Sequence, residues 1–176
     1  MAQLSLTSLS AIYGALQISS NVPVTAALMT PGGPRGTPGT FTGATRALEE
    51  QGVVAVNVSG GGAASSVVLS APWRAARVRI TEVGASGQGP AAPGKVVLVQ
   101  AHHSLLEQLT APPGTRRGSA FAVIVTPLPG SGPLYAGRVV MSSGRGGSLQ
   151  SILPVSSALT VVQLPNVQAE LVTPGR

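Results

Sequence analysis

Short runs in which apolar and polar residues alternate recur along the chain, and clusters of glycine and proline separate them. The clearest run is Arg77–Thr81, where Val78 and Ile80 alternate with arginine and threonine. Because successive side chains of a β-strand point to opposite faces of its sheet, one face of this run is apolar and the other is polar. We therefore predict that Val78 and Ile80 lie in a core and that Arg77 and Arg79 face water.

Eight such runs predict strands, and the 23 glycines and 15 prolines predict frequent turns rather than long helices. The short stretch Ala44–Glu50, in which Arg46 precedes Glu50 by four residues, is the one helical candidate. Many short strands joined by regularly spaced turns are typical of an antiparallel sandwich or barrel. We therefore predict an all-β chain that forms an immunoglobulin-like antiparallel β-sandwich. The predicted strands are Val53–Val58, Ser65–Leu69, Arg77–Val83, Lys95–Gln100, Ser104–Leu109, Ala120–Thr126, Leu134–Met141 and Leu159–Leu164.

A weak internal repeat relates residues 15–27 to residues 122–137. Pro23 aligns with Pro133 at an offset of 110 residues, which is about the length of one immunoglobulin-like sandwich. In both copies an apolar run leads into a turn, and a proline opens the next run, where the edge of a sheet tolerates the missing N–H. We therefore expect the chain to begin inside an upstream repeat.

The repeat and the local composition divide the chain into four parts. Residues 1–31 are predicted to be the closing strands of an upstream sandwich-like repeat, and residues 32–49 a linker rich in proline and glycine. Residues 50–155 are predicted to form the immunoglobulin-like sandwich, and residues 156–176 a C-terminal strand and tail.

Several segments between Ser66 and Val140 resemble a known family. They include Arg-Val-Arg-Ile-Thr-Glu-Val at 77–83, Lys-Val-Val-Leu-Val-Gln-Ala at 95–101 and Phe-Ala-Val-Ile-Val-Thr-Pro at 121–127. The most distinctive is Gly-Pro-Leu-Tyr-Ala-Gly-Arg-Val-Val at 132–140, and residues 159–167 are similar to the same family's ending. The family consists of uncharacterised, secreted actinobacterial proteins and is known as domain of unknown function 5719. The resemblance implies tandem sandwich-like segments in a protein that is secreted or held at the cell envelope, with a signal or anchor helix outside this chain. It implies no catalytic residue.

The residue inventory excludes several chemistries. The chain has no cysteine and no aspartate, so cysteine-based zinc sites, thiol nucleophiles and a Ser-His-Asp triad are impossible. The five glutamates and the pair His102 and His103 are the remaining acid, base or metal-binding groups. His103 and Glu107 would share a face only on a helix, and the strand pattern places them about 13 Å apart. We therefore predict no enzyme, no metal site and no cofactor.

Two glycine-rich stretches superficially match nucleotide-binding loops. Gly89–Lys95 has the glycine and lysine spacing of a phosphate-binding loop, but Pro90 and Pro93 remove N–H donors, and Val96 stands where the loop needs a hydroxyl. The run Val53–Gly62 leads into another apolar run rather than into the helix of a dinucleotide-binding turn. Both stretches favour plain turns between strands.

The charge of the chain is positive but diffuse. Ten arginines and Lys95 against five glutamates give a formal net charge of +6. The cations are scattered and aromatic residues make up only 3% of the chain, a combination that argues against nucleic acid as a partner. No run approaches the roughly 18 apolar residues of a membrane span. An envelope polymer or a partner protein is the expected binding partner.

These observations favour a non-catalytic structural or adhesion module of an exported bacterial cell-envelope protein. The alternative is a domain that binds carbohydrate or an anionic polymer. Its predicted ligand surface is Trp73, which follows Pro72 at the edge of a loop, together with Arg77, Arg79 and Tyr135.

Overall fold

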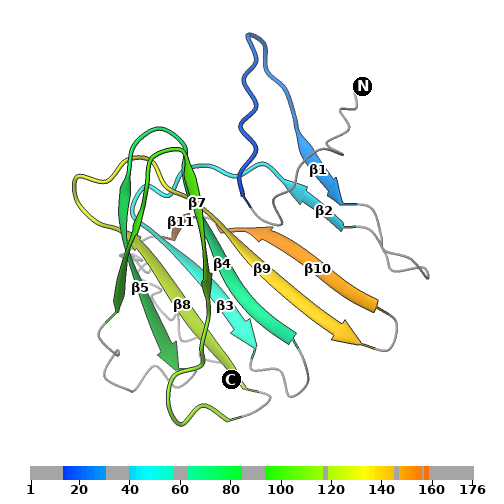
Figure 1. Ribbon diagram of the computed structural model, residues 1–176, viewed down its shortest axis with the longest axis vertical. Coiled ribbons are helices and arrows are strands. Elements are labelled where there is room, and N and C mark those ends of the chain that lie inside the picture. Colours follow the sequence, from blue (N-terminus) through cyan, green and yellow to red (C-terminus); the bar gives the residue numbers. More distant parts are fainter. Residues whose placement is uncertain are drawn as a thin grey trace, which may run out of the picture.

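The computed structural model describes residues 14–30, 40–57, 63–84, 94–116, 119–144, 147–155 and 157–158. In these ranges the regular elements are eleven β-strands, and there is no helix. Nothing in this described part could therefore cross a membrane as a long apolar helix. The prediction of an all-β antiparallel sandwich is confirmed, because two antiparallel sheets pack against each other (Figure 1). Its immunoglobulin-like character stays a prediction.

The strands form two layers and a separate hairpin (Figure 1). One layer is a four-stranded sheet in the order β10-β9-β4-β7, and the other is a five-stranded sheet in the order β11-β3-β8-β5-β6. The hairpin pairs β1 with β2, and β2 lies beside β10. The strands are β1 (Ala27–Thr30), β2 (Thr40–Gly43), β3 (Gln51–Asn57), β4 (Ala63–Ala71), β5 (Ala76–Gly84), β6 (Lys95–Val99), β7 (His103–Gln108), β8 (Ala120–Pro127), β9 (Tyr135–Gly144), β10 (Gly147–Pro154) and β11 (Ser157–Ala158).

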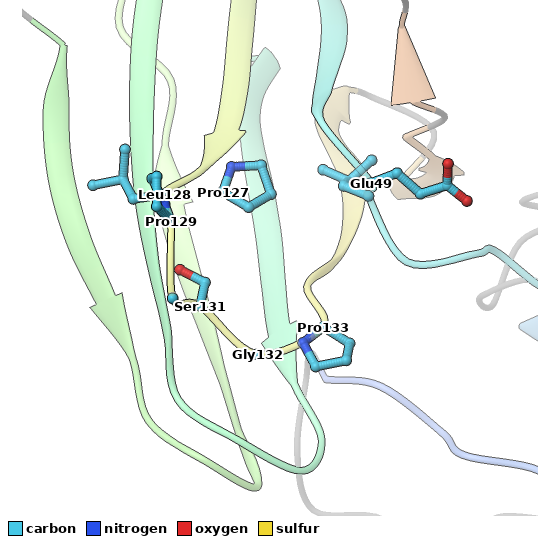
Figure 2. Close-up of a pocket in the computed structure, with 9 residues that line it drawn as sticks. Glu49, Pro127, Leu128, Pro129, Ser131, Gly132 and Pro133 are labelled. Atoms are coloured by element: carbon cyan, nitrogen blue, oxygen red, sulfur yellow. The ribbon is translucent and has the colours of Figure 1, made fainter.

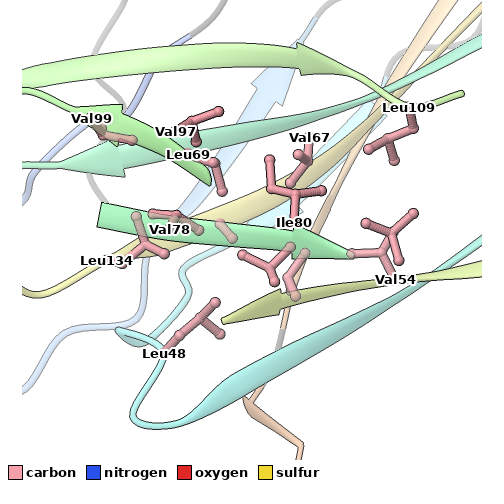
Figure 3. Packing of buried hydrophobic residues seen from close by; sticks show 14 of the residues in the cluster. Leu48, Val54, Val67, Leu69, Val78, Ile80, Val97, Val99, Leu109 and Leu134 are labelled. Atoms are coloured by element: carbon pink, nitrogen blue, oxygen red, sulfur yellow. The ribbon is translucent and has the colours of Figure 1, made fainter. Parts of the chain in front are cut away.

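The core lies between the two sheets and is built from aliphatic side chains of both (Figure 3). On β5, Val78 and Ile80 are buried, whereas Arg77 and Arg79 are exposed, so the predicted assignment of faces is confirmed. Leu69 of β4 reaches the same core from the opposite sheet and is fully buried. Burying each such aliphatic side chain contributes about 1.5–3 kcal/mol, which makes this core the main source of stability.

The chain crosses from one sheet to the other at both sides of the sandwich, between consecutive edge strands. On one side β6 ends the five-stranded sheet, and the next strand, β7, ends the four-stranded sheet. Lys95 Nζ on β6 lies 2.6 Å from Glu107 Oε2 on β7 and links the two edges. On the other side β10 leads through the buried Val155 to β11, which pairs with β3. These crossings hold the two layers together at both margins.

Two local predictions are wrong. The helical candidate Ala44–Glu50 forms no helix; Leu48 instead is buried and donates its N–H to the carbonyl oxygen of Leu134 at 2.7 Å. A seven-residue segment gains too few helical hydrogen bonds to offset nucleation, so this tertiary contact prevails. Residues 15–26 form no strand either, although the repeat predicted one there. The predicted strand Leu159–Leu164 lies outside the described residues.

The division of the chain into repeat, linker, sandwich and tail stays a prediction. Within the stretch predicted as linker, the structure has β2 and the core residue Leu48. Thr42 of β2 donates its hydroxyl hydrogen to the carbonyl oxygen of Ile152 on β10 at 3.0 Å. The hairpin is thus attached to the margin of the four-stranded sheet.

Candidate functional site

Two of the predicted ligand residues, Trp73 and Tyr135, contact each other at one end of the sandwich. Trp73 lies in the turn that leads from β4 to β5, and Tyr135 is the first residue of β9. Their ring centroids are 6.0 Å apart and the ring planes meet at 65°, the edge-to-face arrangement that aromatic pairs prefer. Trp73 remains 46% exposed, so one part of its ring is held by Tyr135 while another part faces water. We call this pair the aromatic corner.

The loop between β8 and β9 positions Tyr135 because it is fastened to the β4–β5 turn. Ser131 Oγ accepts a hydrogen bond from the N–H of Arg77 at 3.0 Å and donates to the carbonyl oxygen of Arg77 at 2.9 Å. The N–H of Gly132 donates to the carbonyl oxygen of Ala75 at 2.9 Å. A Cβ on Gly132 would lie 2.6 Å from both Cβ and the carbonyl oxygen of Arg74, so only glycine allows the loop to approach this closely.

The two predicted arginines do not belong to the aromatic corner. Tyr135 stands opposite Ser70 in the register of β4 and β9, on the outer face of the four-stranded sheet. Arg77 and Arg79 lie on the outer face of the five-stranded sheet, beside Leu98 and Val96 of β6. Since the sheets pack face to face, these outer faces point in opposite directions. The structure therefore divides the predicted ligand surface into an aromatic part and a cationic part.

Arg74 is the cation that accompanies the aromatic corner, and it was not among the predicted ligand residues. It follows Trp73 in the same turn and is exposed. One of its guanidinium nitrogens lies 3.5 Å from the carbonyl oxygen of Gly130. Its position directly after Trp73 was the sequence signal that could have predicted this. The sequence alone, however, does not show that Arg74 lies at the aromatic corner while Arg77 and Arg79 lie elsewhere.

A hollow of about 430 Å³ is lined by the β8–β9 loop together with Leu48 and Glu49 (Figure 2). Its volume is in the range of small-ligand sites. Glu49 is the charged residue in the lining, and its carboxylate points away from Pro127 and Pro133 (Figure 2). The other residues of the lining are uncharged. The lining consists of Leu48, Glu49, Pro127, Leu128, Pro129, Gly130, Ser131, Gly132 and Pro133.

The histidine pair lies at the β6–β7 turn and is separated from Glu107. His102 has a positive φ of 62° and donates its N–H to the carbonyl oxygen of Ala71 at 2.7 Å. His103 Nδ1 lies 2.8 Å from the carbonyl oxygen of Ala101, and both histidines are exposed. Glu107 is engaged with Lys95. Across the described ranges, no group of three or more histidines and glutamates is placed to hold a metal ion. The glycine-rich motif residues 60–62 and 89–93 lie outside these ranges.

The fold and the corner together define a two-layer β-sandwich with an aromatic pair at one end. The chain belongs to the family of unknown function DUF5719, whose model matches residues 1–105. The prediction of this family is therefore confirmed. The match begins ahead of the described residues and ends within β7, so it includes β1 and β2 as well as half of the sandwich.

A solved structure supports the fold. The protein titled "Crystal Structure of Thermotoga maritima 1070" is similar in architecture, with a TM-score of 0.50 at 11% sequence identity. The similar region covers 63% of this chain and 96% of that one. At this identity the likeness concerns the fold alone. No curated protein matches the chain with significant sequence similarity.

Proposed function

We propose that this chain is a non-catalytic structural or adhesion module of an exported bacterial cell-envelope protein. The observation that carries the proposal is the closure of the sandwich on both sides, by β6 with β7 and by β10 with β11. A module that must transmit position or force needs two sheets that do not separate, and connections that cross from one layer to the other supply that linkage. Membership of a family that we expect to carry tandem sandwich-like segments supports a tandem arrangement of such modules in a secreted actinobacterial protein.

Two measurements test this proposal. Fractionation of the producing bacterium should place the protein in the envelope or the medium, and a cytosolic location would contradict the proposal. The purified chain should leave envelope polysaccharide intact. Hydrolysis that the Glu107→Gln variant abolishes would show an enzyme instead, because Glu107 is the half-buried carboxylate at the margin between the sheets.

A second function, binding of carbohydrate or an anionic polymer, is favoured by the aromatic corner. The apolar C–H face of a sugar ring packs well against an aromatic ring, and Trp73 is 46% exposed while Tyr135 limits its movement. Arg74 follows Trp73 in the same exposed turn and supplies a charge for an anionic substituent. The cationic face of Arg77 and Arg79 lies on the opposite sheet and would contact a different part of a long polymer.

Purified envelope polysaccharide is the probe for this second function. We expect Trp73→Ala to weaken binding at least about tenfold, as loss of a central aromatic contact does. The matched control is Leu98→Ala, because Leu98 is similarly exposed at 52% but lies on the outer face of the other sheet. Binding that survives Trp73→Ala unchanged would exclude the aromatic corner as the contact.

A further inference from the structure

Residues 14–26 expose a strand pattern that no described strand covers, and we call this segment the arm. Its large aliphatic side chains all fall on even-numbered positions, at Leu16, Ile18, Val22 and Val24. These four are between 51% and 59% exposed. Apolar residues at alternate positions, here Leu16 and Ile18 before the bend at residues 21–22 and Val22 and Val24 in the part that returns, are the pattern of a strand with one buried face. The arm therefore has the sequence of a sheet strand but lacks a described sheet partner.

The arm points away from the sandwich of its own chain. It rises beyond the two sheets and returns to β1, so within one molecule it does not lie along a sheet edge (Figure 1). The arm carries no charged residue. An uncharged, alternating segment suits an apolar sheet edge rather than a charged surface.

One edge of β3 lacks a described neighbouring strand over most of its length, just as the arm lacks a described sheet partner. Among the described residues, β11 pairs only with Gly52 and Gln51, which leaves β3 from Val53 onward without a strand on that side. Val53 is 46% exposed. Backbone N–H and C=O groups that face no described strand, beside an exposed valine, are a template for another strand.

A small hollow beside this edge supplies a place for an apolar side chain. It has a volume of about 150 Å³ and is lined by Val54 of β3, by Leu153 and Val155 near the crossing to β11, and by Arg138 of β9. Arg138 Nε is buried and has no hydrogen-bond partner. A buried donor without a partner is uncommon, because leaving it unpaired is costly. This atom is enclosed by the molecule itself, so the hollow offers an incoming strand mainly its apolar lining.

We propose that the arm of one molecule adds to the β3 edge of a second copy of this chain. Residues 15–20 form the added strand, with Leu16 and Ile18 on the side of the hollow and Gln17 and Ser19 on the outer face beside Val53. The arm carries no charged residue and the side chains that line the hollow are mostly apolar, so the two surfaces meet without like-charge contact. The exchange is reciprocal, since each copy carries one arm and one edge, and a closed two-fold dimer results. The dimer does not depend on where the protein acts or on what the aromatic corner binds.

Sedimentation of the full chain tests the proposal over about 1–100 µM, the range in which a moderate dimer affinity is measurable. We expect a reversible dimer that the double variant Leu16→Asp/Ile18→Asp weakens at least about tenfold. The matched control is Gln17→Asp/Ser19→Asp, which places the same two charges on the other face of the same segment and should leave the dimer nearly unchanged. A monomer at all concentrations, or a dimer equally sensitive to both double variants, would overturn the proposal.

Disulfide trapping locates the contact, and the absence of cysteine from the chain makes it specific. Mixing the single variants Gln17→Cys and Val53→Cys under mild oxidation should give a mixed disulfide between two chains. The control mixture of Gln17→Cys with Arg79→Cys, on a strand two positions away from β3 in the sheet, should not. Two results would refute exchange between copies. One is equal trapping in both mixtures, and the other is a double variant Gln17→Cys/Val53→Cys that closes its disulfide within one chain rather than between chains.

Discussion

Neighbouring residues of β5 test the assignment of faces on which the sandwich depends. Ile80 is 6% exposed and packs in the core, whereas Arg79 is exposed on the outer face of the same strand. Replacing each in turn by alanine truncates a large side chain in the same strand and backbone environment. The two variants therefore differ mainly in the face from which the atoms are removed.

The expected costs follow from burial. Ile80→Ala removes buried methyl and methylene groups and leaves a cavity, which typically costs about 2–5 kcal/mol. Arg79→Ala changes a solvated side chain and should stay within about 0.5 kcal/mol. At about 4 °C per kcal/mol, Ile80→Ala should lower Tm by roughly 8–20 °C, and Arg79→Ala by about 2 °C or less. Ile80→Asp adds the cost of burying a carboxylate and should unfold a domain with a total stability of about 5–15 kcal/mol.

Thermal and urea unfolding measure this difference. Far-UV circular dichroism reports the sheets, and fluorescence of Trp73, the single tryptophan, reports the end of the sandwich. The two probes should give coincident transitions if the sandwich unfolds as one unit. Equal Tm values for Ile80→Ala and Arg79→Ala would refute the assignment of faces and, with it, the position of the core.

Two further substitutions probe single contacts. Gly52→Ala should cost about 1–3 kcal/mol, because a Cβ there would lie 2.6 Å from Val155 Cγ1; Gly43→Ala, whose Cβ meets nothing within 4 Å, is the control in the same urea titration. The Oγ atoms of Ser70 and Ser104 are 2.7 Å apart, so Ser70→Ala should cost about 1 kcal/mol, and the double alanine variant less than the sum of the two single ones. A double-mutant cycle with no coupling would show that this hydrogen bond does not contribute.

Periodicity predicted the strands well because it reflects burial on one face. The run Arg77–Val83 lies within β5 (Ala76–Gly84), and Lys95–Gln100 corresponds to β6 (Lys95–Val99). The helical candidate failed because its evidence was a single Arg–Glu pair at the i,i+4 spacing, which stabilises a helix by only about 0.2–0.5 kcal/mol. Burial of Leu48 against the core outweighs that contribution.

The candidate site was predicted only in part, because the sequence does not reveal which turns cross between sheets. The turn at Trp73 leads from β4 in one layer to β5 in the other. This crossing separates Arg77 and Arg79 from the outer face on which Tyr135 lies. The contact between Trp73 and Tyr135 arises from the register of β4 with β9, which pairs Ser70 with Tyr135 over a long sequence separation. Register of that kind is set by packing of the whole sheet rather than by local pattern.

The same periodicity has opposite outcomes in β5 and in the arm. On β5, Val78 and Ile80 are buried because β6 and β8 flank the strand and the opposite sheet covers it. In the arm, Leu16 and Ile18 alternate in the same way and remain more than half exposed. Alternation therefore predicts that one face of a segment is buried against an apolar surface. It does not predict whether that surface belongs to the same molecule or to another. Since each exposed aliphatic side chain forgoes about 1 kcal/mol or more of burial, a covering surface for the arm is energetically favoured wherever one is within reach. Within the described ranges, the edge of β3 beyond Gly52 has no partner strand, and because the arm points away from its own sandwich, we propose that it reaches this edge in a second copy.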